Sequence, residues 1–143
     1  MPFIETADHT SLFVTDWGIG PPVVFVHAWG LRSDRWNYQV PALAGAGLRC
    51  VLYDRRGHGR SDRPGTGYDL DTMADDLAAV IGHFGLEDIT LVCHSLGSKE
   101  AIRYLSRHGD ARIARLVLVA PTTADVPAWC ASFEAAGPVR QRP

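Results

Sequence analysis

The chain has 143 residues, a formal net charge of −2 and 46% hydrophobic residues, without a cluster of basic side chains. These values favour one domain with a packed core and exclude a nucleic-acid surface, so no nucleic-acid partner is expected. No segment approaches the roughly 20 apolar residues of a membrane span or resembles a signal peptide, and three cysteines without framework spacing favour the cytoplasm.

The first half of the chain predicts a hairpin followed by a strand, a helix and a strand. Short β-type runs at 3–6 and 11–14 flank a polar segment and predict the hairpin. The apolar run at 23–26 does not alternate with polar residues, which is typical of a strand buried on both faces of a parallel sheet. Apolar residues at helical spacing predict a helix from Trp36 to Gly45, and residues 49–53 predict the next strand.

The second half continues the alternation. One helical face is marked by five apolar residues, with Asp69 or Asp71 as the N-cap and Gly85 as the stop: Met73, Leu77, Val80, Ile81 and Phe84. Residues 89–92 predict a strand, and a helix then reaches about His108. The run 116–120 predicts a last strand before Pro121.

This order indicates an α/β fold. Strands that alternate with helices form a mostly parallel sheet with helices on both faces, here preceded by an N-terminal hairpin. We expect residues 1–121 to form this part of the domain. The segment 122–143 shifts in composition toward Ala, Pro and Arg, and it predicts at most one short helix, at 127–136.

The motif Cys93-His94-Ser95-Leu96-Gly97 lies between a predicted strand and a predicted helix. A sharp strand-to-helix turn exposes a serine hydroxyl and aims the free N–H groups of the helix at a developing oxyanion. The simpler alternative is a serine in an ordinary β–α turn. The position of Ser95 directly after a buried strand favours the nucleophile over this alternative.

Two further segments stand in order before this motif: 26–30, with His27-Ala28-Trp29, and 53–61, with Asp54, Arg56 and three glycine or serine turn residues. Together the three segments resemble the α/β-hydrolase superfamily, in the branch of small esterases and cofactor-free haloperoxidase-like enzymes. The resemblance covers residues 1–121, the N-terminal part of that fold, and implies that its last strands are lacking.

The resemblance implies a hydrolase that acts on a small ester or related acyl substrate through an acyl-enzyme at Ser95. The backbone N–H groups of Trp29 and Leu96 would form the oxyanion hole, and no cofactor or metal is implied. Two residues depart from the pattern, since Cys93 and Ala28 stand where glycine is usual. The 54–61 loop is interpreted as structural.

Other polar residues offer weaker alternatives. His27, His58 and His94 lie near strand ends, but their spacing matches no metal site. His94 as the base and Cys93 as the nucleophile are minor alternatives, and Asp75 and Asp76 are expected to be solvated. After Ser95 the only histidine is His108, which the predicted helix would hold roughly 18 Å away.

A serine nucleophile needs a histidine base and a carboxylate, which this fold places after the serine. Asp125 is the one marginal candidate for the acid. The sequence therefore leaves a rival open: a truncated, inactive chain or a non-catalytic module that self-associates through the open edge of strand 116–120. Perhydrolase or lyase chemistry on the same fold is also left open.

Overall fold

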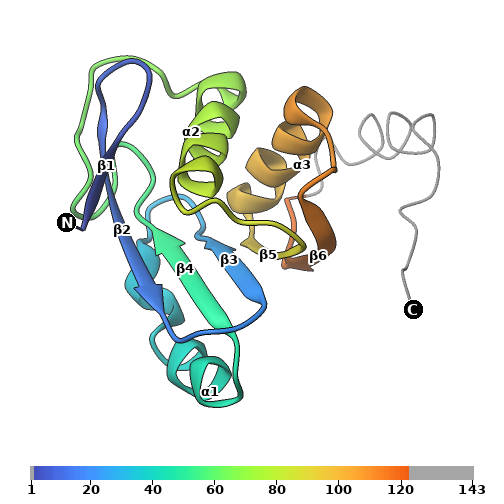
Figure 1. Ribbon diagram of the computed structural model, residues 1–143. Helices are drawn as coiled ribbons and strands as arrows, with labels where there is room; N and C mark the ends of the chain where they lie inside the picture. Colours follow the sequence, from blue (N-terminus) through green and yellow to red (C-terminus); the bar gives the residue numbers. More distant parts are fainter. Residues whose placement is uncertain (1, 123–143) are drawn as a thin grey trace.

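Six strands form one sheet in the order β1-β2-β4-β3-β5-β6 in the computed structural model, which describes residues 2–122 (Figure 1). Strands β3 to β6 run parallel to one another, and β1 and β2 add an antiparallel hairpin beside β4. The strands are β1 (Phe3–Glu5), β2 (Ser11–Trp17), β3 (Pro22–Val26), β4 (Arg49–Tyr53), β5 (Ile89–His94) and β6 (Ile113–Val119). The predicted mostly parallel α/β fold is confirmed.

Four helices connect these strands: η1 (Ser33–Trp36), α1 (Gln39–Gly45), α2 (Leu70–His83) and α3 (Leu96–His108). The single helix predicted from Trp36 to Gly45 is wrong, because η1 ends at Trp36 and α1 starts three residues later. Pro41 explains the break. It is tolerated in the first turn of α1, whereas in a continuous helix its ring would clash with the carbonyl of Asn37.

The central strands of the sheet are buried on both faces. Val24 and Val26 of β3 pack with α2 and α3, whereas Val23 and Phe25 pack with Val40 of α1. Figure 1 shows the same arrangement, with α2 and α3 on one side of the sheet and α1 on the other. The run 23–26 lacks alternation because each side chain enters one of two apolar cores.

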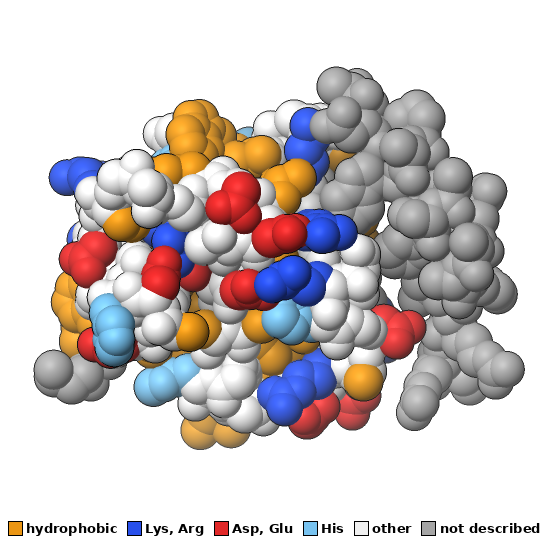
Figure 2. All heavy atoms as spheres, turned by 90° about the horizontal axis from the view of Figure 1, so that it is seen from above, with side chains coloured by type: hydrophobic (Ala, Val, Ile, Leu, Met, Phe, Trp, Pro, Cys, Tyr) orange, Lys and Arg blue, Asp and Glu red, His pale blue; other side chains and the backbone are white. Residues whose placement is uncertain are grey.

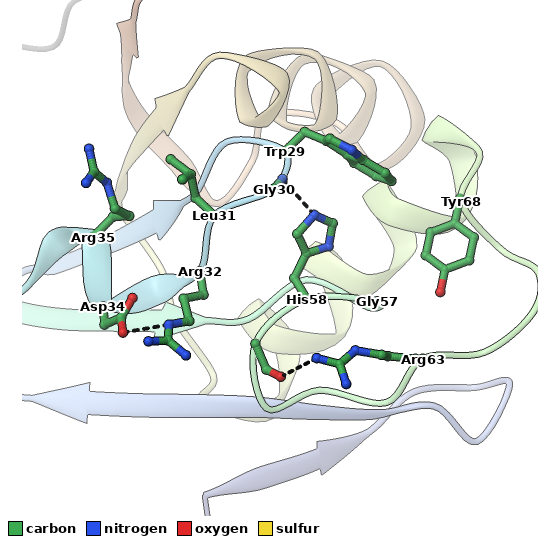
Figure 3. A pocket seen from close by; sticks show the side chains of 11 residues that line it. Trp29, Gly30, Leu31, Arg32, Asp34, Arg35, Gly57, His58, Arg63 and Tyr68 are labelled. Carbon is green, nitrogen blue, oxygen red and sulfur yellow. Dashed lines mark hydrogen bonds and ion pairs between the residues drawn. The ribbon is translucent and has the colours of Figure 1, made fainter.

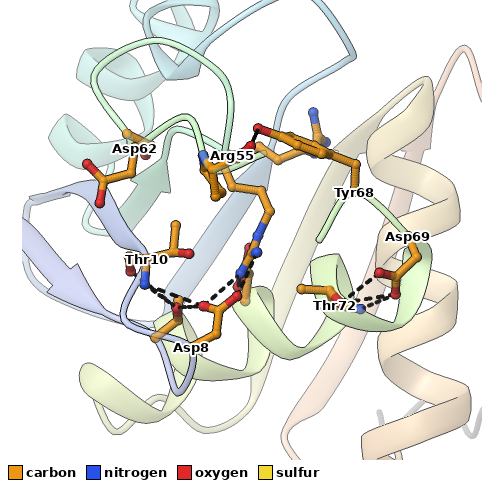
Figure 4. Close-up of polar contacts among 12 residues, drawn as sticks. Asp8, Thr10, Arg55, Asp62, Tyr68, Asp69 and Thr72 are labelled. Atoms are coloured by element: carbon orange, nitrogen blue, oxygen red, sulfur yellow. Dashed lines mark hydrogen bonds and ion pairs between the residues drawn. The ribbon is translucent and has the colours of Figure 1, made fainter. Parts of the chain in front are cut away.

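Helix α2 has the predicted ends. Asp69 is its N-cap, since its carboxylate accepts from the Thr72 N–H at 2.9 Å (Figure 4). Gly85 follows the helix with a φ of +59°, the left-handed conformation common just beyond a helix end. Met73, Leu77, Val80 and Ile81 are all buried, as their helical spacing predicts.

The expectation that Asp76 is solvated is wrong. Its side chain is buried, and its two carboxylate oxygens accept from Arg56 at 2.6 and 2.7 Å. Arg56 also donates to Asp8 at 2.8 Å, at the tip of the β1–β2 hairpin (Figure 4). Arg56 therefore ties the 54–61 loop to the hairpin and to α2, in the structural role predicted for that loop.

Ion pairs join the outer surfaces of α2 and α3. Arg107 donates to Asp75 at 2.7 Å, and Arg103 pairs with Asp71. On the face seen in Figure 2, acidic and basic side chains lie next to one another rather than separated by sign.

Strand β6 lies at the edge of the described sheet. Its last three residues, Val117, Leu118 and Val119, are 39–43% exposed. The short helix predicted at 127–136 lies outside the described residues. The same is true of Asp125.

Candidate active site

The loops that carry the candidate site leave neighbouring strands at the same edge of the sheet. Val26 at the end of β3 pairs with Cys93 in β5, so the Trp29 loop and Ser95 follow adjacent strand ends. From β3 the chain crosses to β4 on the α1 face, and from β5 it crosses to β6 on the α3 face. Such a reversal opens a crevice between two strand ends, which is where open α/β sheets bind ligands.

Ser95 forms a strained turn between β5 and α3. Its φ of 52° and ψ of −113° lie in a region that residues other than glycine rarely adopt. The strain is held by its backbone, since its N–H donates to the Val119 carbonyl at 3.0 Å and its carbonyl accepts from the Ser98 N–H at 2.9 Å. The half-buried Ser95 side chain does not cap α3, so its hydroxyl is left for another partner.

Small residues flank the turn because the backbones come close there. A Cβ on Gly97 would lie 2.6 Å from the Val26 carbonyl oxygen, closer than any side chain tolerates. Cys93 is fully buried, and burial raises the pKa of its thiol well above the ordinary range. Cys93 is therefore a packing residue and not a thiolate nucleophile.

The Trp29 loop is a tight turn whose peptide groups are held from several sides. The Ala28 carbonyl accepts from His27 Nδ1 at 2.8 Å and from the Leu31 N–H at 3.2 Å. The Gly30 N–H donates to His58 Nε2 at 3.0 Å (Figure 3). Within residues 2–122 the Trp29 N–H has no hydrogen-bond partner, and the Leu96 N–H begins a helix and lacks an intrahelical acceptor.

A buried ion pair connects the segments that carry the Trp29 loop and the Ser95 turn. Arg55 donates to Glu100 at 2.7 Å, and both side chains have no exposed surface. Arg55 also donates to the His27 carbonyl at 2.6 Å, and Tyr53 donates its hydroxyl to Glu100. The network connects the ends of β3 and β4 to α3, the helix that starts at the elbow.

His27 is held neutral by this network. Burial and the neighbouring Arg55 lower the pKa of His27 to about 3. Its Nε2 accepts from the Arg55 N–H at 2.9 Å while its Nδ1 donates to the Ala28 carbonyl. Both nitrogens are occupied, so His27 positions the loop and does not act as a base.

A cleft of about 910 Å³ opens beside the Trp29 loop, on its β4 side. Figure 3 shows Trp29, His58 and Tyr68 together at one end of it, with the Trp29 and His58 ring centroids 4.7 Å apart. The lining also includes Arg32, which pairs with Asp34, and Arg63, which donates to the Gly59 carbonyl. Ser95 does not line this cleft.

None of the six histidines in the sequence hydrogen bonds to the Ser95 hydroxyl in the part of the chain that the structure describes. The ring of His94 lies 6.3 Å from that of Trp36, in an edge-on arrangement. His108 ends α3 and bonds to Asp75 at 2.7 Å. Residues 2–122 also contain no group of His, Cys, Asp and Glu side chains able to hold a metal ion.

The sequence analysis did not assign Glu100 or His58 to this site. Glu100 has a signal, since it lies three residues after Gly97 and four before Tyr104 and so falls on the buried face of α3. His58 has none, because its bond to Gly30 spans 28 residues. The predicted residues Trp29, Ser95 and Leu96 follow the carboxyl ends of the adjacent strands β3 and β5.

The chain is similar to known proteins along most of its length. A family model described as "alpha/beta hydrolase fold" matches residues 21–140. The chain is 48% identical over 119 residues to a non-heme haloperoxidase of Rhodococcus erythropolis, covering 83% of this chain and 43% of that protein. It is 39% identical over 121 residues to a bifunctional esterase/perhydrolase of Acinetobacter calcoaceticus, covering 83% and 44%.

A solved structure agrees with the fold. An esterase from Exiguobacterium antarcticum superposes with a TM-score of 0.82 at 39% identity, covering 83% of this chain and 44% of the esterase. The chain thus spans less than half the length of these relatives, and its match is to their N-terminal part. Among the helices of the described residues, none is long and apolar enough to cross a membrane.

Proposed function

The chain belongs to the alpha/beta hydrolase fold family, and from that premise we propose that it carries the nucleophile and oxyanion hole of a serine hydrolase. Its substrate class is a small ester or a related acyl compound. The observation that carries the proposal is the strained φ of Ser95 at the strand-to-helix turn. Strained residues of this kind cluster at active sites, where the surrounding structure holds them.

In the proposed reaction the Ser95 Oγ attacks the acyl carbonyl carbon and loses its proton to a base. The carbonyl oxygen becomes an oxyanion, which the N–H groups of Trp29 and Leu96 stabilise. Collapse of the tetrahedral intermediate expels the alcohol and leaves an acyl-Ser95 ester. Water then hydrolyses this ester and restores the serine.

No histidine of the described residues 2–122 is placed to act as the base of this reaction. Within the chain, His27 is neutral and doubly bonded, and His58 has both ring nitrogens engaged. His94 lies beside the Trp36 ring, and His108 bonds to Asp75. Without a triad histidine the attack of Ser95 lacks its general base, so the chain by itself should be a slow esterase that is acylated at Ser95.

Hydrolysis of p-nitrophenyl acetate by the purified chain tests this proposal. We expect a slow release of p-nitrophenol that is lost in Ser95→Ala and kept in Ser98→Ala. Ser98 is a matched control, because it lies three residues further along the chain and its buried hydroxyl has no hydrogen-bond partner among residues 2–122. Equal rates of p-nitrophenol release by the unmodified chain and by Ser95→Ala would contradict the assignment of Ser95 as the nucleophile.

The exposed edge of β6 supports a second proposal, that the chain pairs with another strand there, in a second copy of itself. An edge strand presents unpaired N–H and carbonyl groups, and Val117 and Leu118 add exposed apolar surface. Sedimentation velocity should then show a dimer that Leu118→Lys weakens. A monomer at every concentration would contradict self-association and leave the hydrolase proposal untouched.

A further inference from the structure

Two histidines hold the two successive peptide groups of the Trp29 loop. His27 donates to the Ala28 carbonyl and so orients the Ala28–Trp29 peptide, whose N–H points away from that carbonyl. His58 accepts the Gly30 N–H at 3.0 Å and so orients the following Trp29–Gly30 peptide. The Trp29 N–H lies between these two anchors.

The contacts of His58 determine its protonation state. Its Nδ1 lies 3.0 Å from the Arg56 carbonyl, which can only accept a hydrogen bond, so Nδ1 carries the proton. Its Nε2 faces the Gly30 N–H, which can only donate, so Nε2 carries the lone pair. Both contacts are satisfied at once only by a neutral imidazole protonated on Nδ1.

We propose that His58 is a positioning residue of the oxyanion loop, and that as a neutral acceptor it fixes the Trp29–Gly30 peptide so that the Trp29 N–H faces the crevice. The role of the Trp29 N–H in this inference rests on the proposed function, whereas the contact between His58 and the Gly30 N–H does not. Protonation of Nε2 would turn the acceptor into a donor facing the Gly30 N–H. The turn would then lose its anchor.

The surroundings of His58 favour the neutral form. Only 8% of its surface is exposed, the Trp29 ring packs edge-on against it, and the neutral His27 ring lies 5.3 Å away. Burial lowers the pKa of His58 below its ordinary value of 6.5, and Arg55 acts in the same direction. Glu100, Asp54 and the bond to the Arg56 carbonyl act the other way.

Long-range ¹H–¹⁵N correlation spectra of the chain test the contact without requiring activity. The His58 signals, assigned by their loss in His58→Gln, should show a neutral ring protonated on Nδ1 that persists below pH 6.5. In His58→Phe the Gly30 amide should exchange with solvent about 5- to 10-fold faster, as expected for one lost hydrogen bond. His58→Gln, which retains an acceptor, should restore much of this protection.

A proton on Nε2, or unchanged Gly30 exchange in His58→Phe, would overturn the proposal. Should His58→Phe unfold, the tautomer of the unmodified chain still decides. Labelling of Ser95 by a fluorophosphonate adds the functional test: we expect a rate about tenfold lower in His58→Phe and unchanged in His83→Phe, on the outer end of α2. Equal labelling of His58→Phe and the unmodified chain would overturn the positioning role, whereas no labelling of the unmodified chain would overturn the proposed hydrolase function alone.

Discussion

Replacing Gly97 by alanine tests how closely the elbow helix must approach the sheet. The new Cβ would lie 2.6 Å from the Val26 carbonyl oxygen and 3.0 Å from its Cγ1. Val26 cannot yield, because β3 is hydrogen-bonded to β4 on one side and to β5 on the other. The start of α3 must therefore move away from β3 by several tenths of an ångström.

The expected loss of stability follows from two opposing effects. Overpacking against a backbone atom costs about 3 kcal/mol, at the upper end for such substitutions. Alanine in place of a helical glycine returns about 1 kcal/mol, so Gly97→Ala should lower the free energy of unfolding by about 2 kcal/mol.

Gly82→Ala is the matched control, since Gly82 is also helical and no described atom outside its own helix backbone and chain neighbours lies within 4 Å of its would-be Cβ. It should raise the free energy of unfolding by up to about 1 kcal/mol. Urea unfolding followed by circular dichroism measures both changes. If Gly97→Ala were as stable as Gly82→Ala, the close approach of α3 to β3 would be refuted.

Three further predictions concern the buried polar groups. The folded-state pKa of His27 is lowered to about 3, so unfolding takes up a proton as the pH falls below 6.5, and between pH 7.5 and 5 the free energy of unfolding should fall by about 2 kcal/mol. Urea unfolding should show a smaller fall in His27→Gln, and an equal fall in both proteins would contradict a buried, neutral His27. Glu100→Gln, which leaves the charge of buried Arg55 uncompensated, should cost about 3–5 kcal/mol, whereas thermal unfolding of Asp75→Asn, which breaks an exposed pair, should match the unmodified chain. In a Cys130→Ser background, burial of Cys93 and Cys50 should prevent any reaction with a thiol reagent until denaturant is added, and labelling of the native protein would refute the packing role of Cys93.

Much of the fold could be predicted because local patterns determine it. The unbroken apolar run at 23–26 indicated a strand with two buried faces, and Val24 and Phe25 do enter separate cores. Asp69 and Gly85 bound α2 as predicted, since caps depend on residues close in sequence. The helix predicted from Trp36 to Gly45 was too long because the position of Pro41 in its turn was not weighed.

The site was predicted less completely, and the misses share a cause. Asp76 looked like an exposed acidic residue, but Arg56 from another segment buries and neutralises it. Glu100 and His58 find their partners 45 and 28 residues away, which periodicity does not report. By contrast, the turn at Ser95 between a strand and a helix was predicted because it is local: strand, turn and helix are contiguous in the chain.

The most direct test of the central claim is to locate the covalent adduct. The chain would be incubated with a fluorophosphonate, digested and sequenced by tandem mass spectrometry, with Ser95→Ala and Ser98→Ala in parallel. The account predicts one modified serine, Ser95, in the unmodified chain and in Ser98→Ala, and no modification in Ser95→Ala. An adduct at another residue, or an adduct that persists in Ser95→Ala, would contradict the assignment of Ser95 as the nucleophile.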